Sequence, residues 1–430
     1  MNQGFMQRPP PDRLSQQIQR SAIHLDTLQA GHGFDDLHPF AHVVGDARIV
    51  ALGEATHGTR EFFLLKHRLV EFLVAELGFN VFAIEANWPE SEVVNEYVLT
   101  GKGDPAAALA GLRFWTWDTE EVLALIEWMR SWNARQGQVR PVRFAGIDAQ
   151  FPSHAVSRIR AYLRAVDPAI EGAIASTLEQ IGVLERFGEH GDDDTERHLS
   201  EATRELGARL RAEQSLYTAR SSPEEWRRAS HHARILSQID ELRHAADDTV
   251  QFTVRDRAMA DNVNYLLHDG KPETKVIVWA HNGHVTRDSR GLFDPDVMTM
   301  GRMLSERHGD RYLAVGFAFG AGSFQAIVDA DSDTAKLDDV HVGAPQDGCF
   351  DAVLMGAART PGFLLDMRQQ AGELTEWLRR EQLSRETGAV FLREEDMHAR
   401  VIPAARYDVL AFVRHTTRAR PNPTGHRPRR

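Results

Sequence analysis

Six short apolar runs, rich in β-branched residues, recur along this 430-residue chain with helical patterns between them. We expect strands at residues 48–53, 80–85, 142–147, 275–280, 312–319 and 407–412. Most of these runs are apolar throughout, which is typical of strands covered on both faces, as in a parallel sheet. The segment REFFLLKHRLVEFLVAELGF, between the first two runs, has apolar residues at helical spacing. The sequence therefore predicts an α/β fold with a mainly parallel central sheet flanked by helices.

Residues 154–268 differ from the rest of the chain, because long charged segments of helical period follow one another there without a strand candidate. We expect a large helical insertion over the active-site cleft of an α/β core, whose two parts span residues 25–153 and 269–415. The pattern leaves open whether the insertion takes part in binding or only packs. Residues 1–24 are expected to be flexible, and the basic, Pro-rich residues 416–430 to form a disordered tail.

Charge and composition exclude several classes of partner. The formal net charge of −12 disfavours nucleic acid and anionic membranes. No run approaches the roughly 20 apolar residues of a spanning helix, and the start lacks the apolar stretch of a signal peptide. The single cysteine, Cys349, excludes an intramolecular disulfide and a cysteine-based zinc site. These features predict a cytoplasmic protein and leave its oligomeric state open.

Ionisable residues follow four of the expected strands at the same relative place. They are Glu54, Glu85, Asp148, His281 and His284. Ligands of open α/β sheets bind beyond the carboxyl ends of the strands. If these strands are parallel neighbours, the five side chains and His57 converge on one cleft. A helix cap or a loop salt bridge would explain any one of them, but not four strands that end alike, so the sequence predicts a functional site.

The residue types in this set favour proton transfer. Histidine titrates near neutral pH, and a carboxylate beside it can fix its tautomer. Glu54 lies three residues before His57, so the carboxylate can orient the ring while His57 takes a proton from water. His281 and His284 can supply a second acid or base, or a donor to a developing oxyanion. The same residue types also bind zinc, iron or manganese, so metal-assisted hydrolysis stays open at this point.

Four further residues are candidates for substrate contact or support. Lys66 lies about two and a half turns beyond His57 on the expected helix and can return to the same face, or be a surface lysine. Arg255 can meet a substrate oxygen or pair with Glu85. Trp88 and Trp117 can wall an apolar pocket or pack in the core. Neither a G-x-S-x-G nucleophile motif nor a phosphate-binding loop is present.

The motifs LGEATHGTREFF, FAIEANWPES, GIDAQ, VRDRAMADNV and VWAHNGHV, taken together, resemble the erythromycin esterase family. The resemblance implies an α/β core with a helical part closing over a deep cleft, and hydrolysis of a macrolide macrolactone by water activated without a metal. It implies that His57 is the general base and that Glu54, Glu85, His281 and His284 complete the catalytic cluster. Lys66 stands where the family often has arginine, and lysine lacks the planar fork for bidentate contacts.

The resulting hypothesis is a carboxylic ester hydrolase that acts on a small-molecule ester or lactone without a metal or other cofactor. In this hypothesis Lys66, Asp148, Arg255, Trp88 and Trp117 bind substrate or support the cluster. Antibiotic resistance would follow if the substrate is a macrolide, which the sequence does not decide. The alternatives are a metal-dependent hydrolase that uses the same cluster, and a non-catalytic protein that binds haem or another small ligand.

Overall fold

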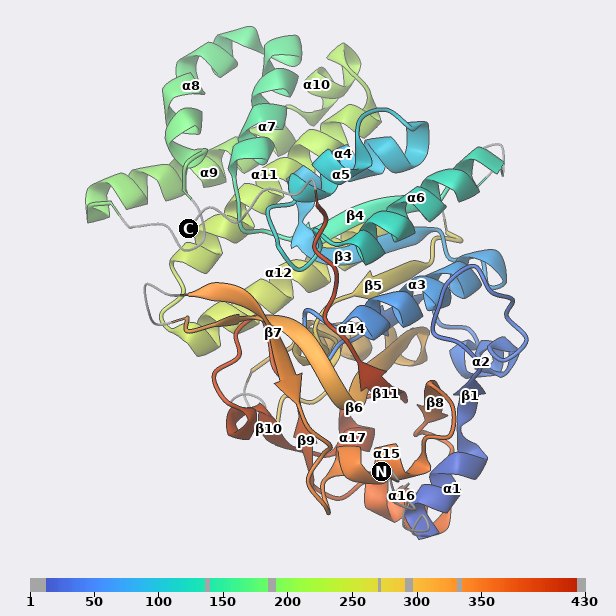
Figure 1. Ribbon diagram of the computed structural model, residues 1–430. Helices are drawn as coiled ribbons and strands as arrows, with labels where there is room; N and C mark the ends of the chain where they lie inside the picture. The colour runs from blue at the N-terminus through green and yellow to red at the C-terminus, as the bar shows by residue number, and fades with distance from the viewer. Residues whose placement is uncertain are drawn as a thin grey trace.

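The computed structural model describes residues 13–135, 140–184, 191–269, 272–290, 297–330 and 335–423. Its main sheet has the strand order β1-β8-β11-β6-β2-β5-β3-β4, and β7 pairs with β6 (Figure 1). The strands of this sheet are β1 Ile23–Leu25, β2 Ile49–Leu52, β3 Val81–Asn87, β4 Arg143–Asp148, β5 Val276–Trp279, β6 Tyr312–Val328, β7 Lys336–Val342, β8 Gly362–Asp366 and β11 Val409–Thr416. A separate pair consists of β9 Gln382–Arg385 and β10 His398–Val401.

Parallel pairing dominates the sheet, which confirms the predicted α/β class. From β11 through β6, β2, β5 and β3 to β4, every pair of neighbours is parallel. The antiparallel pairs join β1 to β8, β8 to β11 and β6 to β7. All six expected strands are present, and β6 continues well beyond the predicted end at residue 319. The short strands β1, β7, β8, β9 and β10 were not predicted.

Both faces of the sheet are apolar because helices cover both of them. In β2, Val50 and Leu52 belong to one buried cluster, whereas Ile49 and Ala51 belong to the other. The first face is covered by α2 His38–Val44, α3 Arg60–Ala75, α4 Trp88–Thr100, α5 Pro105–Ala110 and α6 Glu120–Arg135. The second is covered by α1 Arg13–Ser21, α12 Asp248–Asp269, α13 Asn282–Val285, α14 Met300–His308, α15 Phe350–Ala357 and α16 Gly372–Leu378. Since alternate residues enter opposite cores, every position of such a strand must be apolar.

The described residues between β4 and β5 form helices joined by short connections, with no strand among them. These helices are α7 Ser153–Val166, α8 Pro168–Ile181, α9 Asp193–Ala212, α10 Gln214–Arg220 and α11 Pro223–Arg243, followed by α12. Helices α7 to α11 share an apolar cluster of their own that includes Leu163, Leu206 and Tyr217. Figure 1 shows these helices stacked above the β4 end of the sheet, whereas α12 returns to pack on β3, β4 and β5. The insertion therefore reaches the strand ends through α12.

Described residues near both ends of the chain contain secondary structure or backbone bridges. Residues 13–24, expected to be flexible, contain α1 and the start of β1, and α1 packs against α15. Residues 416–423, expected to belong to a disordered tail, run beside two distant loops. There Arg418 forms a bridge with Thr59, and Pro421 forms one with Thr119. The remaining expected flexible residues, 1–12 and 424–430, lie outside the described residues.

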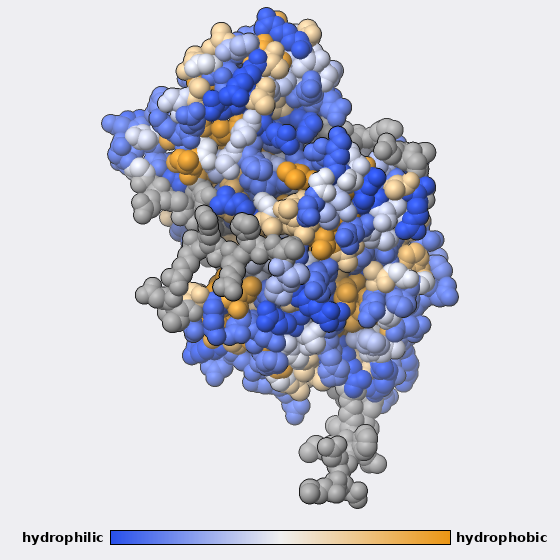
Figure 2. All heavy atoms as spheres, turned by 45° about the horizontal axis from the view of Figure 1, so that its top comes forward, coloured by the Kyte–Doolittle hydropathy of each residue, from blue (hydrophilic) through white to orange (hydrophobic). Residues whose placement is uncertain are grey.

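The described helices and the visible surface are polar in character. None of the described helices is both long and apolar enough to cross a membrane. The face drawn in Figure 2 is dominated by hydrophilic residues, with apolar residues scattered among them. Large apolar side chains that are exposed include Val183 at 76% and Leu392 at 59%. Scattered residues of this kind are ordinary on the surface of a folded protein.

Candidate active site

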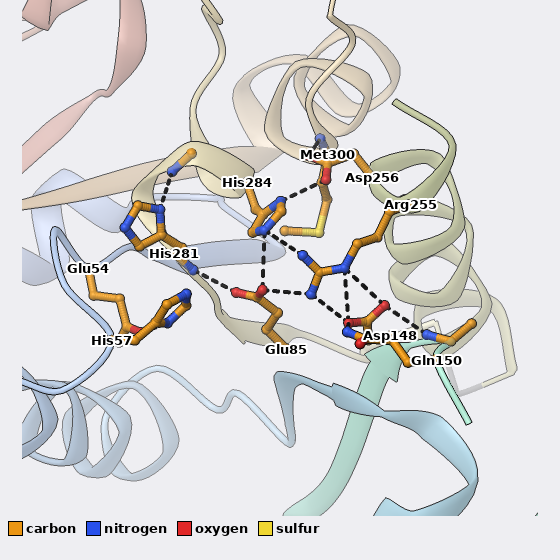
Figure 3. A network of polar contacts seen from close by, with 12 residues as sticks. Glu54, His57, Glu85, Asp148, Gln150, Arg255, Asp256, His281, His284 and Met300 are labelled. Carbon is orange, nitrogen blue, oxygen red and sulfur yellow. Dashed lines mark hydrogen bonds and ion pairs between the residues drawn. The ribbon is translucent and has the colours of Figure 1, made fainter. Parts of the chain in front are cut away.

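The carboxyl ends of four strands bring the predicted ionisable residues together. Strands β2, β5, β3 and β4 are consecutive neighbours in the sheet, so their ends lie along one edge. Figure 3 shows that the side chains from these strand ends point toward one another. Arg255 from α12 joins Glu85 and Asp148 in a polar network that also includes His284 and the backbone N–H of His281. Glu54 and His57 form a separate hydrogen-bonded pair beside this network.

Two glycines shape the backbone that presents these side chains. Gly58 follows His57 directly, and a Cβ atom there would lie 2.1 Å from the carbonyl oxygen of Gln325. Gly146 in β4 lies opposite a register shift in β3 between Ile84 and Asn87, and a Cβ atom at Gly146 would lie 2.4 Å from a β3 carbonyl oxygen. Any larger residue would push β4 or the His57 loop away from its neighbour. The irregularity in β3 falls at Glu85, where the site lies.

Glu54 holds two other members of the site through its two carboxylate oxygens. Its Oε1 lies 2.7 Å from Nδ1 of His57, and its Oε2 accepts hydrogen bonds from Nζ of Lys66 at 2.7 Å and Nε1 of Trp279 at 2.8 Å. Burial alone would raise the pKa of Glu54, but the charges of Lys66 and His57 outweigh it and lower this pKa. Glu54 is therefore an ionised acceptor.

Lys66 lies beneath Glu54 and is fully buried. Its Nζ atom also lies 4.4 Å from the centre of the Trp279 ring, a cation–π contact. Burial lowers the pKa of Lys66 to about 8, although the charge of Glu54 acts in the opposite direction. Lys66 is therefore a buried cation that pairs with the Glu54 carboxylate, and its side chain is not on the surface.

His57 has one ring nitrogen engaged and one free. Because the ionised Glu54 can only accept, Nδ1 of His57 carries the proton and donates it. Among the described residues, no polar atom is hydrogen-bonded to Nε2, and the side chain is 12% exposed. The ring lies 4.9 Å from that of His281 and 6.1 Å from that of Trp117, between centroids. Nε2 is thus a lone-pair acceptor on a side chain that is partly open to solvent.

Glu85 is held by three donors and is an acceptor only. One oxygen lies 2.8 Å from a guanidinium nitrogen of Arg255 and 3.2 Å from Nε2 of His284. The other accepts the backbone N–H of His281 at 2.9 Å. Burial alone would raise the pKa of Glu85, but the positive charges of His284 and Arg255 bring it well below the ordinary value. Glu85 is therefore not a proton donor at neutral pH.

His284 lies between two carboxylates and is positively charged. Its Nδ1 lies 2.6 Å from Oδ1 of Asp256, whose Oδ2 accepts the backbone N–H of Met300 at 2.6 Å. Burial alone would lower the pKa of His284, but Asp256 and Glu85 raise it to about 9. Both ring nitrogens are therefore protonated and donate, so His284 has no free nitrogen for a second base.

Arg255 uses its guanidinium group inside the protein. It donates to Asp148 at 2.6 and 3.1 Å and to Glu85 at 2.8 Å. It also lies 3.0 Å from Nε2 of His284, which is protonated, donates to Glu85 and does not accept from Arg255. Asp148 in turn accepts a hydrogen bond from the side-chain amide of Gln150. The sequence left two roles open for Arg255, and in the structure Arg255 forms the ion pair with Glu85. Asp148, at the end of β4, forms a second ion pair with the same guanidinium group.

His281 is a neutral ring with both nitrogens engaged. The backbone N–H of Gly283 donates to its Nδ1 at 3.1 Å, so the ring proton is on Nε2, which lies 3.2 Å from the carbonyl oxygen of Thr387. Burial lowers the pKa of His281 to about 4, and a positive charge on His57 acts in the same direction. In this arrangement neither ring nitrogen of His281 is free to accept a proton.

The two tryptophans have different positions. Trp117 is buried in the cluster, and its Nε1 donates to the carbonyl oxygen of Glu85 at 2.9 Å. Trp88 instead faces the insertion, with its ring centroid 4.2 Å from that of His231. It lines a cavity of about 490 Å³ beside Arg143, at the opposite end of β4 from Asp148. The structure therefore does not bring Trp88 to the cluster, and we locate the candidate site by side-chain chemistry and not by cavity size.

Several members of the site were not predicted from the sequence. Asp256 and Trp279 lie inside the motifs VRDRAMADNV and VWAHNGHV, within two residues of Arg255 and His281, and this closeness is the signal that points to them. Asn282 lies between the two histidines of AHNGH and bonds to β6. Thr387 has no local signal, because only the fold brings it to His281.

The cluster does not fit a metal ion. Apart from Nε2 of His57, its donor atoms are used on one another, on two cationic side chains, Lys66 and Arg255, or on the backbone, while His284 is itself positively charged. In the part of the chain that the structure describes, no three or more His, Cys, Asp or Glu side chains are arranged to bind a metal ion.

Comparison with known proteins identifies relatives along most of the chain. The family model described as erythromycin esterase matches residues 74–416. The erythromycin esterase type II of Escherichia coli is 25% identical over 357 residues, which cover 77% of this chain and 83% of that protein. The putative hydrolase YbfO of Bacillus subtilis is 24% identical over 426 residues, covering 93% of this chain and 90% of that protein.

Solved structures share the fold along nearly the whole chain. A Bacillus cereus protein superposes with a TM-score of 0.85 at 24% identity, covering 96% of this chain and 99% of that one. A mutant of the erythromycin esterase EreC in its open conformation superposes with a TM-score of 0.71 at 17% identity, covering 91% of this chain and 96% of that one. Since the family model extends over most of the sequence, the chain belongs to the erythromycin esterase family of hydrolases.

Proposed function

We propose that this chain is a carboxylic ester hydrolase in which His57 activates a water molecule without a metal ion. One observation carries the proposal: of the three cluster histidines as described, His57 alone keeps a ring nitrogen free. Its other nitrogen is held by Glu54 at 2.7 Å, which keeps the lone pair on Nε2. General-base help from such a residue contributes about 10²–10⁴ in rate.

The reaction follows from this tautomer. Nε2 of His57 takes a proton from water while the water oxygen bonds to the ester carbonyl carbon. The Glu54 carboxylate stabilises the imidazolium that forms. When the tetrahedral intermediate collapses, the bond from carbon to the alcohol oxygen breaks, and His57 returns its proton to that oxygen. An open-chain ester gives an acid and an alcohol, whereas a lactone gives one hydroxy acid.

The relatives support a cyclic ester as the first substrate class to test. Two Escherichia coli proteins similar to this chain are named erythromycin esterases, of types I and II. We therefore propose a macrolide lactone, or a smaller lactone, as the substrate. Inactivation of a macrolide antibiotic is the role that follows if such a lactone is opened.

The test is a mass-spectrometric screen of intact macrolides, simple lactones and open-chain esters for hydrolysis, which for a lactone appears as the gain of one water. We expect turnover by the wild type and by the control His268→Ala, whose imidazole is exposed, and loss of turnover in His57→Ala. Turnover is expected to persist in a chelator. Unchanged activity in His57→Ala would show that His57 is not the base. Activity that disappears with the chelator and returns with added metal would contradict the metal-free reaction.

A further inference from the structure

A segment far from the catalytic motifs in sequence joins two loops of the site. Glu386 and Thr387 follow β9, and the backbone N–H of Thr387 donates to the carbonyl oxygen of Ala55 at 2.8 Å. The carbonyl oxygen of Thr387 faces Nε2 of His281 at 3.2 Å. One residue thus contacts both the loop that carries Glu54 and the loop that carries His281.

Glu386 is fixed by a buried, two-point ion pair. Arg406 donates to Oε1 at 2.7 Å and to Oε2 at 3.1 Å. The Glu386 side chain is 7% exposed and that of Arg406 is 1% exposed, so water competes little for this ion pair. The Tyr407 hydroxyl also lies 3.4 Å from Oε1. Bidentate contacts of this type specify geometry as well as energy.

Glu386 also contacts the histidine loop directly, through Asn282. The side-chain amide of Asn282 lies 3.3 Å from Oε1 of Glu386 and forms hydrogen bonds with both backbone groups of Phe317, at 2.8 and 3.0 Å. Its backbone N–H donates to the carbonyl oxygen of Glu54 at 2.9 Å. Asn282 therefore ties the histidine loop to β6 and to the Glu54 loop.

We propose that Glu386 is a positioning residue, which fixes the Glu386–Thr387 segment so that Thr387 holds the His281 ring in one tautomer beside His57. The ring centroids of His57 and His281 are 4.9 Å apart. A neutral His281 next to His57 avoids like-charge repulsion when His57 receives the proton of water. Without the Thr387 acceptor, the bond from the Gly283 N–H to Nδ1 alone would hold the His281 ring. The catalytic part of this inference rests on the proposed function, whereas the ring position can be measured without substrate.

A buried ion pair is a poor explanation of stability alone. Apolar side chains of similar volume often replace such pairs without loss of stability. Here Glu386 also accepts a hydrogen bond from Asn282 on the histidine loop, and the next residue, Thr387, contacts both the histidine loop and the Glu54 loop. The contribution that distinguishes the Glu386–Arg406 pair is therefore that it holds Thr387 and Asn282 in position.

The test compares Glu386→Gln with the control Glu381→Gln, which removes an exposed pair with Arg400 on the neighbouring strands. With p-nitrophenyl butyrate as substrate, we expect kcat per folded molecule of Glu386→Gln to fall by about ten- to a hundredfold with KM unchanged. The control should match the wild type. In protein labelled with ¹⁵N-histidine, the signals of His281, identified by their loss in His281→Gln, should show Nε2–H in the wild type and change in Glu386→Gln.

A folded Glu386→Gln protein with wild-type kcat and wild-type His281 signals would overturn the inference. If Glu386→Gln does not fold, the double variant Glu386→Leu with Arg406→Met removes both buried charges. A reduced kcat with changed His281 signals in the double variant would support the inference, and wild-type values of both would overturn it. If the wild type hydrolyses none of the esters screened, the proposed function fails, while the ¹⁵N signals still decide whether Glu386 positions His281.

Discussion

Nδ1 of His57 lies 2.7 Å from Oε1 of Glu54, and this contact decides which nitrogen of the ring can accept a proton. The Glu54 carboxylate is ionised because Lys66 and His57 lower its pKa more than burial raises it. An ionised carboxylate accepts only, so the proton of the neutral ring stays on Nδ1. Nε2 is left with its lone pair, on a side chain that is partly exposed.

Glu54→Gln is expected to lower kcat by about a hundredfold or more, because an amide no longer stabilises the imidazolium. The variant also leaves Lys66 buried without its carboxylate, which costs about 3–5 kcal/mol of unfolding free energy. Steady-state kinetics corrected for the folded fraction, with urea denaturation alongside, separates the two effects. The control is Glu76→Gln, at an exposed position after α3. A folded Glu54→Gln enzyme with wild-type kcat would contradict the role of Glu54.

Lys66 is expected to set the upper pH limit of activity. Below a pH of about 8 its ammonium group is charged and holds Glu54; above it, the proton is lost and Glu54 loses its cation. In Lys66→Arg the cation persists, since guanidinium has a pKa above about 12, and the alkaline limb of kcat/KM should move to higher pH. The exposed Lys102→Arg is the control. Identical alkaline limbs in wild type and Lys66→Arg would rule out this assignment.

His284 is expected to make stability depend on pH. Its pKa is raised in the folded state from 6.5 to about 9, so its stabilising contribution is complete below pH 6.5 and is lost as pH rises through 9. Between pH 6.5 and 8 this corresponds to about 2 kcal/mol of unfolding free energy.

The measurement for His284 is urea denaturation of the wild type and Asp256→Asn at several pH values from 6.5 to 8. Asp256→Asn removes one of the two carboxylates that raise the pKa of His284, so its stability should fall less over this range. The range ends at pH 8 because the pKa of Lys66 is lowered to about 8. Above that pH the loss of the Lys66 proton increases the free energy of unfolding, which opposes the effect of His284. An equal fall in both proteins would show that His284 is not the group responsible.

The C-terminal segment is expected to support the His57 loop. The backbone N–H of Ala419 donates to the carbonyl oxygen of Gly58 at 2.8 Å, and that of Arg60 donates to Thr417 at 2.9 Å. Truncation after Thr416 removes both bonds, which at about 1 kcal/mol each should lower stability by about 2 kcal/mol and reduce kcat. Thermal unfolding and ester turnover provide the check, with truncation after Pro423 as the control. Equal activity and melting temperature in both truncations would contradict this support.

The predictable part of the site lies in short local patterns. Glu85 and Asp148 were found because each closes an apolar run, and parallel strands bring such ends to one edge. The direction in which a side chain faces was harder to predict. Trp88 follows β3 as closely as the site residues do, yet the start of α4 turns it toward α11 and α12. Spacing from His57 placed Lys66 correctly on the inner face of α3, although its complete burial depends on Glu54.

The sequence alone determined the layered α/β architecture and the set of ionisable residues at its strand ends, because periodicity and strand-end chemistry are local properties. Only the tertiary structure decided which ring nitrogens are free, which carboxylates are ionised, and that Glu386 and Thr387 belong to the site. Protonation depends on burial and on charges contributed by distant segments, such as Arg255 on α12 beside Glu85 on β3. Such contacts join residues far apart in the chain, so no local pattern encodes them.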